Sequence, residues 1–149
     1  MAEWVKRQYS KGGIDRAGRI LMEWWTTPGD NMGLEEWNTA YAVVQNWRTC
    51  HALPLNVIQA GLRGRIRRVE QDAIVAQRLK RFSSIMNKLA RESDMKLSQM
   101  HDLGGCRAIL SNVIAVNAIY RMYEQPDQGL YEESSLKCYD YIVKPKNDG

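Results

Sequence analysis

The spacing of apolar residues changes near position 73, and this change constrains the fold more than any other feature of the chain. Before it, apolar side chains recur every three or four residues, which predicts helices over Ile14–Trp25, Leu34–Trp47 and Leu55–Asp72. From Ala73 to Arg81, a spacing of two residues favours a strand. Continuation of the preceding helix is the alternative interpretation of the same segment.

The rest of the chain predicts an alternation of helix and strand. Serine and asparagine side chains accept hydrogen bonds from the first amides of a helix, and apolar runs bounded by glycine are typical of buried strands. The expected elements are a helix capped by Ser83 or Ser84 and ending at Arg91, a strand over Leu103–Leu110, a helix capped by Ser111 or Asn112, and a strand over Leu136–Val143.

These elements together predict an α/β (α+β) fold. A helical N-terminal region at residues 1–72 precedes residues 73–149, which we expect to form an incomplete mixed β-sheet flanked by helices. At 149 residues the two regions have the length of one domain, and we expect them to pack as one. The chain stops at Asp148-Gly149, a pair typical of hairpin turns, so we expect a fragment or a domain truncated within a sheet, and a frayed C-terminal tail is the alternative.

The composition of the chain indicates the cellular compartment in which we expect it. No apolar run approaches the roughly 20 residues that span a bilayer, so no membrane partner is expected. The first residues lack the apolar stretch of a secretory signal. The three cysteines are Cys50, Cys106 and Cys138, an odd number without CxxC spacing, which argues against a disulfide framework or a zinc ribbon. We therefore expect a cytoplasmic protein.

Basic residues are concentrated in one part of the chain. The whole chain has a net charge of +4, whereas the stretch from Arg63 to Arg91 holds nine basic residues and two acidic ones and carries +7. A local field of this strength attracts polyanions such as nucleic acids, nucleotide phosphates or anionic lipids. A solvated basic helix face is the alternative reading of the same charges.

A candidate phosphate site lies at the end of the strand predicted over 73–81. Alternation places Arg78 and Lys80 on one side of it, Arg81 follows, and a helix N-terminus is expected at Ser84 with Lys88 one turn later. Guanidinium, ammonium and helix-end amides that converge in this way suit a di- or triphosphate. The glycine-rich loop of the Walker type is absent from the sequence.

Asp102 is the candidate metal ligand, because it directly precedes the strand predicted over 103–110. A carboxylate beside a phosphate-binding cluster is where a magnesium ligand is expected, and a loop aspartate that caps a turn is the alternative. Arg107 lies within that strand and needs an acidic or phosphate partner if it is buried. His51 and His101 lack a pattern that indicates a catalytic or metal-binding role.

Three segments, taken in order, resemble the RelA/SpoT nucleotidyltransferase domain. They are QRLKRFSSIMNKL at 77–89, MHDLGGCRAIL at 100–110 and DYIVKPKNDG at 140–149. The upstream segment NWRTCHALPLN at 46–56 is similar to the helical part of stand-alone members. The resemblance implies a nucleotidyltransferase-like fold and transfer of pyrophosphate from ATP to the ribose 3′-hydroxyl of GDP or GTP, which yields AMP and (p)ppGpp.

The resemblance also implies roles for individual residues. Asp102 corresponds to the magnesium-binding catalytic aspartate, and Mg²⁺ with ATP are the implied cofactor and donor. The implied nucleotide-binding residues are Arg78, Lys80, Arg81, Ser84, Lys88, Arg107 and Lys146. The family's guanine-stacking tyrosine and second acidic residue have no counterpart in this sequence, and Tyr139 stands where many members have a basic residue. We therefore expect weak or no synthetase activity from these 149 residues.

Two other functions remain open at this point. A toxin-type relative would place the pyrophosphate on the 3′ end of tRNA, with Arg63 to Arg68 contacting the RNA backbone. A non-enzymatic RNA-binding protein or regulatory remnant would bind RNA in a salt-sensitive way, but it leaves Asp102 unexplained. The acceptor, the oligomeric state and allosteric ligands cannot be inferred from the residues.

Overall fold

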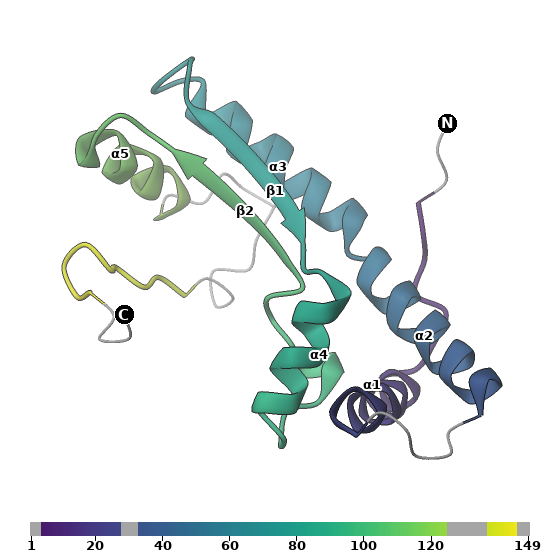
Figure 1. Cartoon of the computed structure of the whole chain (residues 1–149). Helices are drawn as coiled ribbons and strands as arrows, with labels where there is room; N and C mark the ends of the chain where they lie inside the picture. The colour runs from purple at the N-terminus through teal and green to yellow at the C-terminus, as the bar shows by residue number, and fades with distance from the viewer. Residues whose placement is uncertain (1–3, 28–32, 125–136, 146–149) are drawn as a thin grey trace. The chain divides into compact units, whose positions relative to one another are not determined.

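A computed structural model describes residues 4–27, 33–124 and 137–145 of the chain. It has the mixed α/β architecture that the sequence predicts (Figure 1). In chain order the elements are α1 (Lys11–Thr26), α2 (Leu34–Thr49), α3 (Ala52–Ile66), β1 (Ile74–Leu79), α4 (Phe82–Arg91), the 3₁₀ turn η1 (Leu97–Gln99), β2 (Gly104–Ile109) and α5 (Val113–Glu124). None of the helices among these residues is long and apolar enough to cross a membrane.

The contacts divide the chain into two compact units, Met1–Ile109 and Leu110–Gly149. Within the first unit, α1 packs on α2 and α4, and α3 packs on both strands. The helical region predicted over 1–72 and the beginning of the region predicted over 73–149 therefore share one compact unit. The boundary between the two units lies after β2.

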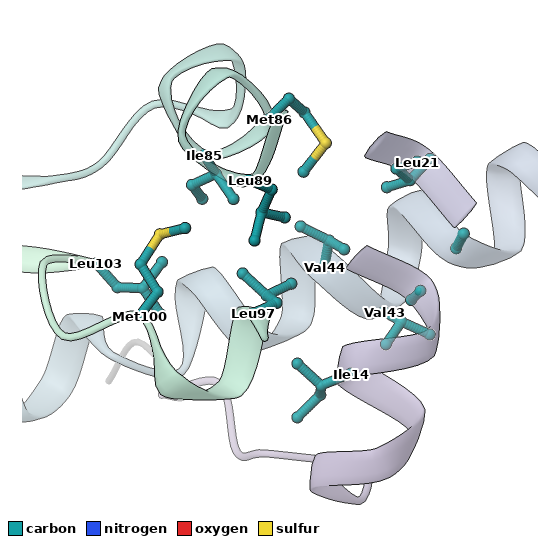
Figure 2. Close-up of a cluster of buried hydrophobic side chains, with 12 residues drawn as sticks. Ile14, Leu21, Val43, Val44, Ile85, Met86, Leu89, Leu97, Met100 and Leu103 are labelled. Carbon is teal, nitrogen blue, oxygen red and sulfur yellow. The ribbon is translucent and has the colours of Figure 1, made fainter. Parts of the chain in front are cut away.

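The first unit is built around an apolar core that α1, α2, α4 and η1 enclose (Figure 2). Its buried side chains recur at helical spacing, so each helix turns one apolar face inward. The core residues are Ile14, Ala17, Leu21, Ala40, Val43, Val44, Ile85, Met86, Leu89, Leu97, Met100 and Leu103.

One local feature defines the start of α1, and another allows α1 to pack closely on η1. The Ser10 hydroxyl caps the helix by accepting a hydrogen bond from the Gly13 amide at 3.2 Å. Gly18 lies where α1 meets η1, and a Cβ atom built there would approach the Leu97 Cβ to 2.9 Å. Only glycine allows the two backbones to approach this closely.

Helix α3 differs from its predicted range at both ends. It begins at Ala52 rather than Leu55, so Pro54 occupies its first turn, where a missing amide hydrogen costs no helical hydrogen bond. It ends at Ile66, six residues before Asp72, and the Val69 amide then donates to the Ile66 carbonyl at 2.9 Å. A turn, rather than more helix, therefore leads into β1.

Strands β1 and β2 confirm the two predicted strands and pair antiparallel, with Arg78 opposite Gly105 and Ala76 opposite Arg107. Helix α3 packs on one face of this pair. A Cβ atom built on Gly104 would lie 3.3 Å from the Leu55 side chain. On the opposite face the arginines of both strands are exposed.

Helix α4 begins earlier than the sequence suggested. Its N-cap is Arg81, and no side chain makes a cap hydrogen bond, so the predicted cap at Ser83 or Ser84 is wrong. Phe82, the first helical residue, packs against the core, with its ring 5.0 Å from that of Tyr41. Tertiary packing of this aromatic side chain therefore sets the start of the helix.

In the second unit, the start of α5 is as predicted, whereas the last strand is not. The Asn112 side chain caps α5 by accepting a hydrogen bond from the Ala115 amide at 2.9 Å. The strand predicted over 136–143 is wrong for residues 137–143, because the Asp140 carboxylate accepts hydrogen bonds from the amides of Ile142 and Val143 at 2.9 and 3.0 Å and forms a turn. Leu136 and the Asp148-Gly149 pair lie outside the described residues.

Candidate nucleotide-binding site

The candidate site forms where β1 passes into α4 and where the chain enters β2. Lys80 follows β1, Lys88 lies two turns into α4, and Asp102 precedes β2. The Lys80 Nζ donates to Asp102 Oδ2 at 2.9 Å, and the Lys88 Nζ donates to Asp102 Oδ1 at 3.0 Å. Each carboxylate oxygen thus has its own ammonium partner. The sequence places these groups up to 22 residues apart, and the sheet brings them together.

The two lysines hold Asp102 in its ionised form. Partial burial by itself raises the pKa of the Asp102 carboxyl, but hydrogen bonds from Lys80 and Lys88, together with their positive charges, outweigh it and lower the pKa from 3.8 to about 2. The lysine side chains are 15% and 20% exposed and that of Asp102 is 50% exposed. The carboxylate is therefore open to solvent while its partners are largely covered.

Arg78 and Arg107 lie on the exposed face of the β1–β2 pair, opposite α3. Arg78 pairs with Gly105, and Arg107 is two residues further along β2, so the two arginines are diagonal neighbours. A Cβ atom at Gly105 would have open space around it. Arg107 is not buried, because the strand alternation turns this side chain outward, so burial alone does not require an acidic or phosphate partner for it. Arg78 and Arg107 therefore form an exposed cationic surface, and Gly105 between them adds no side chain to it.

Arg81 and Ser84 lie in the first turn of α4. Arg81 is exposed and Ser84 is half-buried, and no side chain caps the amides of this turn. Within the described part of the chain, the hydrogen bonds to Asp102 come from Lys80 and Lys88, so Arg81 and Ser84 are neighbours of the cluster rather than members of it. Lys146 lies outside the described residues.

A comparison with protein families gives this arrangement a context. Residues 77–149 match the model described as the region found in RelA/SpoT proteins. The match begins within β1 and includes Lys80, Lys88 and Asp102. The chain contains a RelA/SpoT-type region. No curated protein matches the chain.

The side chains around Asp102 fit a metal ion only if phosphate groups supply further ligands. Among the residues described, no group of three or more histidine, cysteine, aspartate or glutamate side chains lies together. Asp102 is a single carboxylate with two ammonium groups within 3.0 Å, which repel a free cation. Mg²⁺ is commonly held by one or two carboxylates and the phosphates of its substrate. The residues therefore fit Mg²⁺ that arrives with a polyphosphate.

His51 and Cys106, which the sequence did not assign to the site, have contacts of their own. The His51 Nδ1 lies 2.6 Å from the Trp47 carbonyl oxygen, and the His51 ring packs edge-on against the Trp47 ring. Burial raises the pKa of the Cys106 thiol, which lies 3.9 Å from the Leu55 carbonyl oxygen. A thiol in this setting is a poor nucleophile. Neither side chain joins the Asp102 cluster.

Sequence reasoning missed two residues that support the site. The half-buried Arg48 of α2 donates from its Nε to the Lys80 carbonyl at 2.7 Å. The Asp15 carboxylate of α1 accepts from the Ser98 amide and hydroxyl at 2.8 and 3.0 Å, which anchors the segment ahead of Asp102. Both contacts join residues at least 32 positions apart. Periodicity carries no signal for such pairs. The hint for Arg48 is its place in the segment 46–56 that resembles stand-alone RelA/SpoT members, and the hint for Asp15 is a polar residue on a packed helix.

Proposed function

We propose that this RelA/SpoT-type chain binds ATP as its magnesium complex and transfers pyrophosphate to the 3′-hydroxyl of GDP or GTP, as a (p)ppGpp synthetase. The observation that carries the proposal is the ionised Asp102 held between Lys80 and Lys88 inside the RelA/SpoT region. The family match supports the relation to (p)ppGpp synthetases. The donor, the metal and the acceptor are what the proposal adds.

The charges of the site suit a triphosphate. Arg78, Lys80, Arg81, Lys88 and Arg107 contribute five cations and Asp102 one anion, so the site carries a net charge of +4. In a partly desolvated site, the electrostatic attraction between such groups and a polyanion is stronger than it is in water. Arg78 and Arg107 present flat guanidinium groups on the open sheet face, and Arg81 adds its charge at the N-terminus of α4.

Asp102 is the residue that would hold Mg²⁺. The metal supplies charge neutralisation on the phosphate oxygens when it is bound. Because the pKa of Asp102 is about 2, this carboxylate is ionised at every physiological pH and needs no deprotonation to act as a ligand. Lys80 and Lys88 orient it and add positive charge beside the phosphates.

The proposed reaction balances as a displacement at the β-phosphorus of ATP. The acceptor 3′-oxygen forms the new bond to that phosphorus, the bond to the oxygen bridging the α- and β-phosphates breaks, and AMP leaves with that oxygen. The hydroxyl proton passes to solvent or to a base. The chain's own contribution is to orient the triphosphate and offset its charge, which is how enzymes accelerate most phosphoryl-type transfers.

Nucleotide binding tests the donor half of the proposal directly. Titration calorimetry with ATP should detect binding in the presence of Mg²⁺, and Asp102→Asn should weaken it by tenfold or more. Asp94→Asn is the matched control, because Asp94 is an exposed aspartate outside the cluster. Equal effects of the two substitutions would contradict the proposal.

A radioactive label on ATP can identify the molecule that accepts the pyrophosphate. ATP labelled on its γ-phosphate should transfer the label to GDP or GTP. Transfer to tRNA is the second candidate, and exposed Arg63, Arg67 and Arg68 at the end of α3 favour it, because they could bind an RNA backbone. Label that appears on the 3′ end of tRNA and not on GDP would replace the first acceptor with the second.

A further inference from the structure

The carbonyl group of Lys80 has an unusual position in the backbone. It follows the last hydrogen bond of the strand pair, in which the Lys80 amide donates to the Leu103 carbonyl at 2.7 Å. It precedes the first helical acceptor of α4, which is the Arg81 carbonyl that receives the Ile85 amide at 3.0 Å. The Lys80 carbonyl therefore lies between strand and helix. Lys80 is half-buried, and a backbone carbonyl in such a position needs a partner from elsewhere in the fold.

Arg48 supplies that partner. Its Nε donates to the Lys80 carbonyl at 2.7 Å, and it comes from α2, which lies 32 residues earlier in the chain. The backbone of Lys80 is thus held by two hydrogen bonds of 2.7 Å: its amide donates to the Leu103 carbonyl, and its carbonyl accepts from the Arg48 side chain of α2. The Lys80 side chain is then directed to Asp102 at 2.9 Å.

We propose that Arg48 is a positioning residue for the Lys80–Asp102 pair, through which the helical N-terminal region sets the geometry of the nucleotide site. Where it concerns nucleotide binding, this inference rests on the function proposed above. Arg48 lies outside residues 77–149, so the site of the RelA/SpoT region depends on a side chain that the family match does not include.

Lys88 provides an internal comparison for this inference. It binds the same carboxylate as Lys80, at 3.0 Å, but it lies inside α4, where helical hydrogen bonds fix its backbone. Loss of Arg48 should therefore disturb Lys80 more than Lys88. A role for Arg48 in overall stability alone would affect both lysines equally.

Matched variants separate positioning from stability. Arg48→Met keeps an unbranched side chain that reaches as far as the position of the Nε, and it removes the donor together with the rest of the guanidinium group. Arg48→Lys keeps the charge but puts a methylene where the Nε was. Asn46→Ala is the control on the same helix, because Asn46 bonds the Gln8 amide and the Lys6 carbonyl, each at 3.0 Å, and has no bond to Lys80.

The first measurement uses the full chain without nucleotide. In ¹⁵N-lysine-labelled protein, ammonium groups held in ion pairs exchange their protons slowly enough for NMR detection. The Lys80 signal should broaden or disappear in Arg48→Met, and it should change to a smaller extent in Arg48→Lys. It should stay unchanged in Asn46→Ala. The Lys88 signal should remain in all three variants. A Lys80 signal that is unchanged in folded Arg48→Met overturns the inference. If that variant does not fold, an unchanged signal in Arg48→Lys overturns it.

The second measurement is ATP binding below the melting temperature of each variant. Loss of one positioning hydrogen bond should weaken the binding of ATP by about fivefold in Arg48→Met. Asn46→Ala should bind ATP like the parent chain. Equal ATP affinity in all variants, together with a disturbed Lys80 signal, would refute the role of Arg48 in nucleotide binding. Failure of the parent chain to bind ATP would refute the proposed function while the NMR result still decides the role of Arg48 toward Lys80.

Discussion

Asp102→Asn is the substitution whose effect on stability can be worked out most fully from the structure. The pKa of the Asp102 carboxyl is 3.8 in an unperturbed setting and about 2 in the fold. A difference of this size corresponds to about 2.4 kcal/mol of stabilisation by the ionised form. Because the Asp102 side chain is 50% exposed, solvent screening reduces this to about 1 kcal/mol. Asp102→Asn should therefore lower the free energy of unfolding by about 1 kcal/mol at pH 7.

The pH dependence of this difference follows from the direction of the shift. A carboxyl group whose pKa is lower in the folded state stabilises the fold above its unfolded pKa, and the stabilisation disappears as the pH falls through the folded pKa. The gap between the parent chain and Asp102→Asn should thus be constant from pH 8 to 5. It should fall to about half at pH 3.

Urea unfolding followed by circular dichroism measures this gap at each pH. Asp94→Asn is again the control, and because Asp94 is exposed it should change the free energy of unfolding by less than about 0.5 kcal/mol. An Asp102→Asn chain as stable as the parent at pH 7, or a gap that is the same at pH 3 and pH 7, would refute the ion-pair reasoning.

Two further predictions concern the fold and use the same unfolding assay. Gly18→Ala should destabilise the chain by about 1–3 kcal/mol, because the new Cβ would lie 2.9 Å from the Leu97 Cβ, whereas Gly64→Ala in α3 has nothing within 4 Å and should stabilise by about 1 kcal/mol. Equal effects at both glycines would disprove the close approach of α1 to η1. Ile85→Ala should cost about 3 kcal/mol because Ile85 is fully buried, whereas Ile114→Ala, at a site 82% exposed, should change the stability by less than about 0.5 kcal/mol. A small loss at Ile85 would mean that α4 does not pack as the structure shows.

Much of the local structure could be predicted from the sequence. The apolar spacing that marks α1 and α2, and the two-residue alternation of β1, arise from the geometry of the elements themselves. The Asn112 cap of α5 is likewise a contact between residues three positions apart. Such features depend on neighbours along the chain, so the sequence pattern contains them.

Some of the differences lie where distant residues decide the outcome. The serine caps predicted for α4 fail because Phe82 packs beside Tyr41 and starts the helix at that point. Arg107 is exposed because pairing with β1 leaves its side chain on the open face, so burial does not require a partner for it, and a phosphate partner stays a prediction. The strand predicted to end at Val143 is wrong for a local reason instead, because the Asp140 carboxylate accepts hydrogen bonds from the amides two and three residues later and forms a turn.

The sequence by itself determined the helices and the two strands of the first unit to within a few residues, and it determined which residues are candidates for phosphate chemistry, because both follow from residue type and short-range spacing. Only the tertiary structure decided which candidates meet. Lys80 and Lys88 reach Asp102 because β1 and β2 pair in one register and α4 packs on the core. Arg48 reaches the Lys80 carbonyl because α2 packs within the same unit. Contacts between residues far apart in the chain depend on packing and strand register, and spacing along the sequence does not encode them.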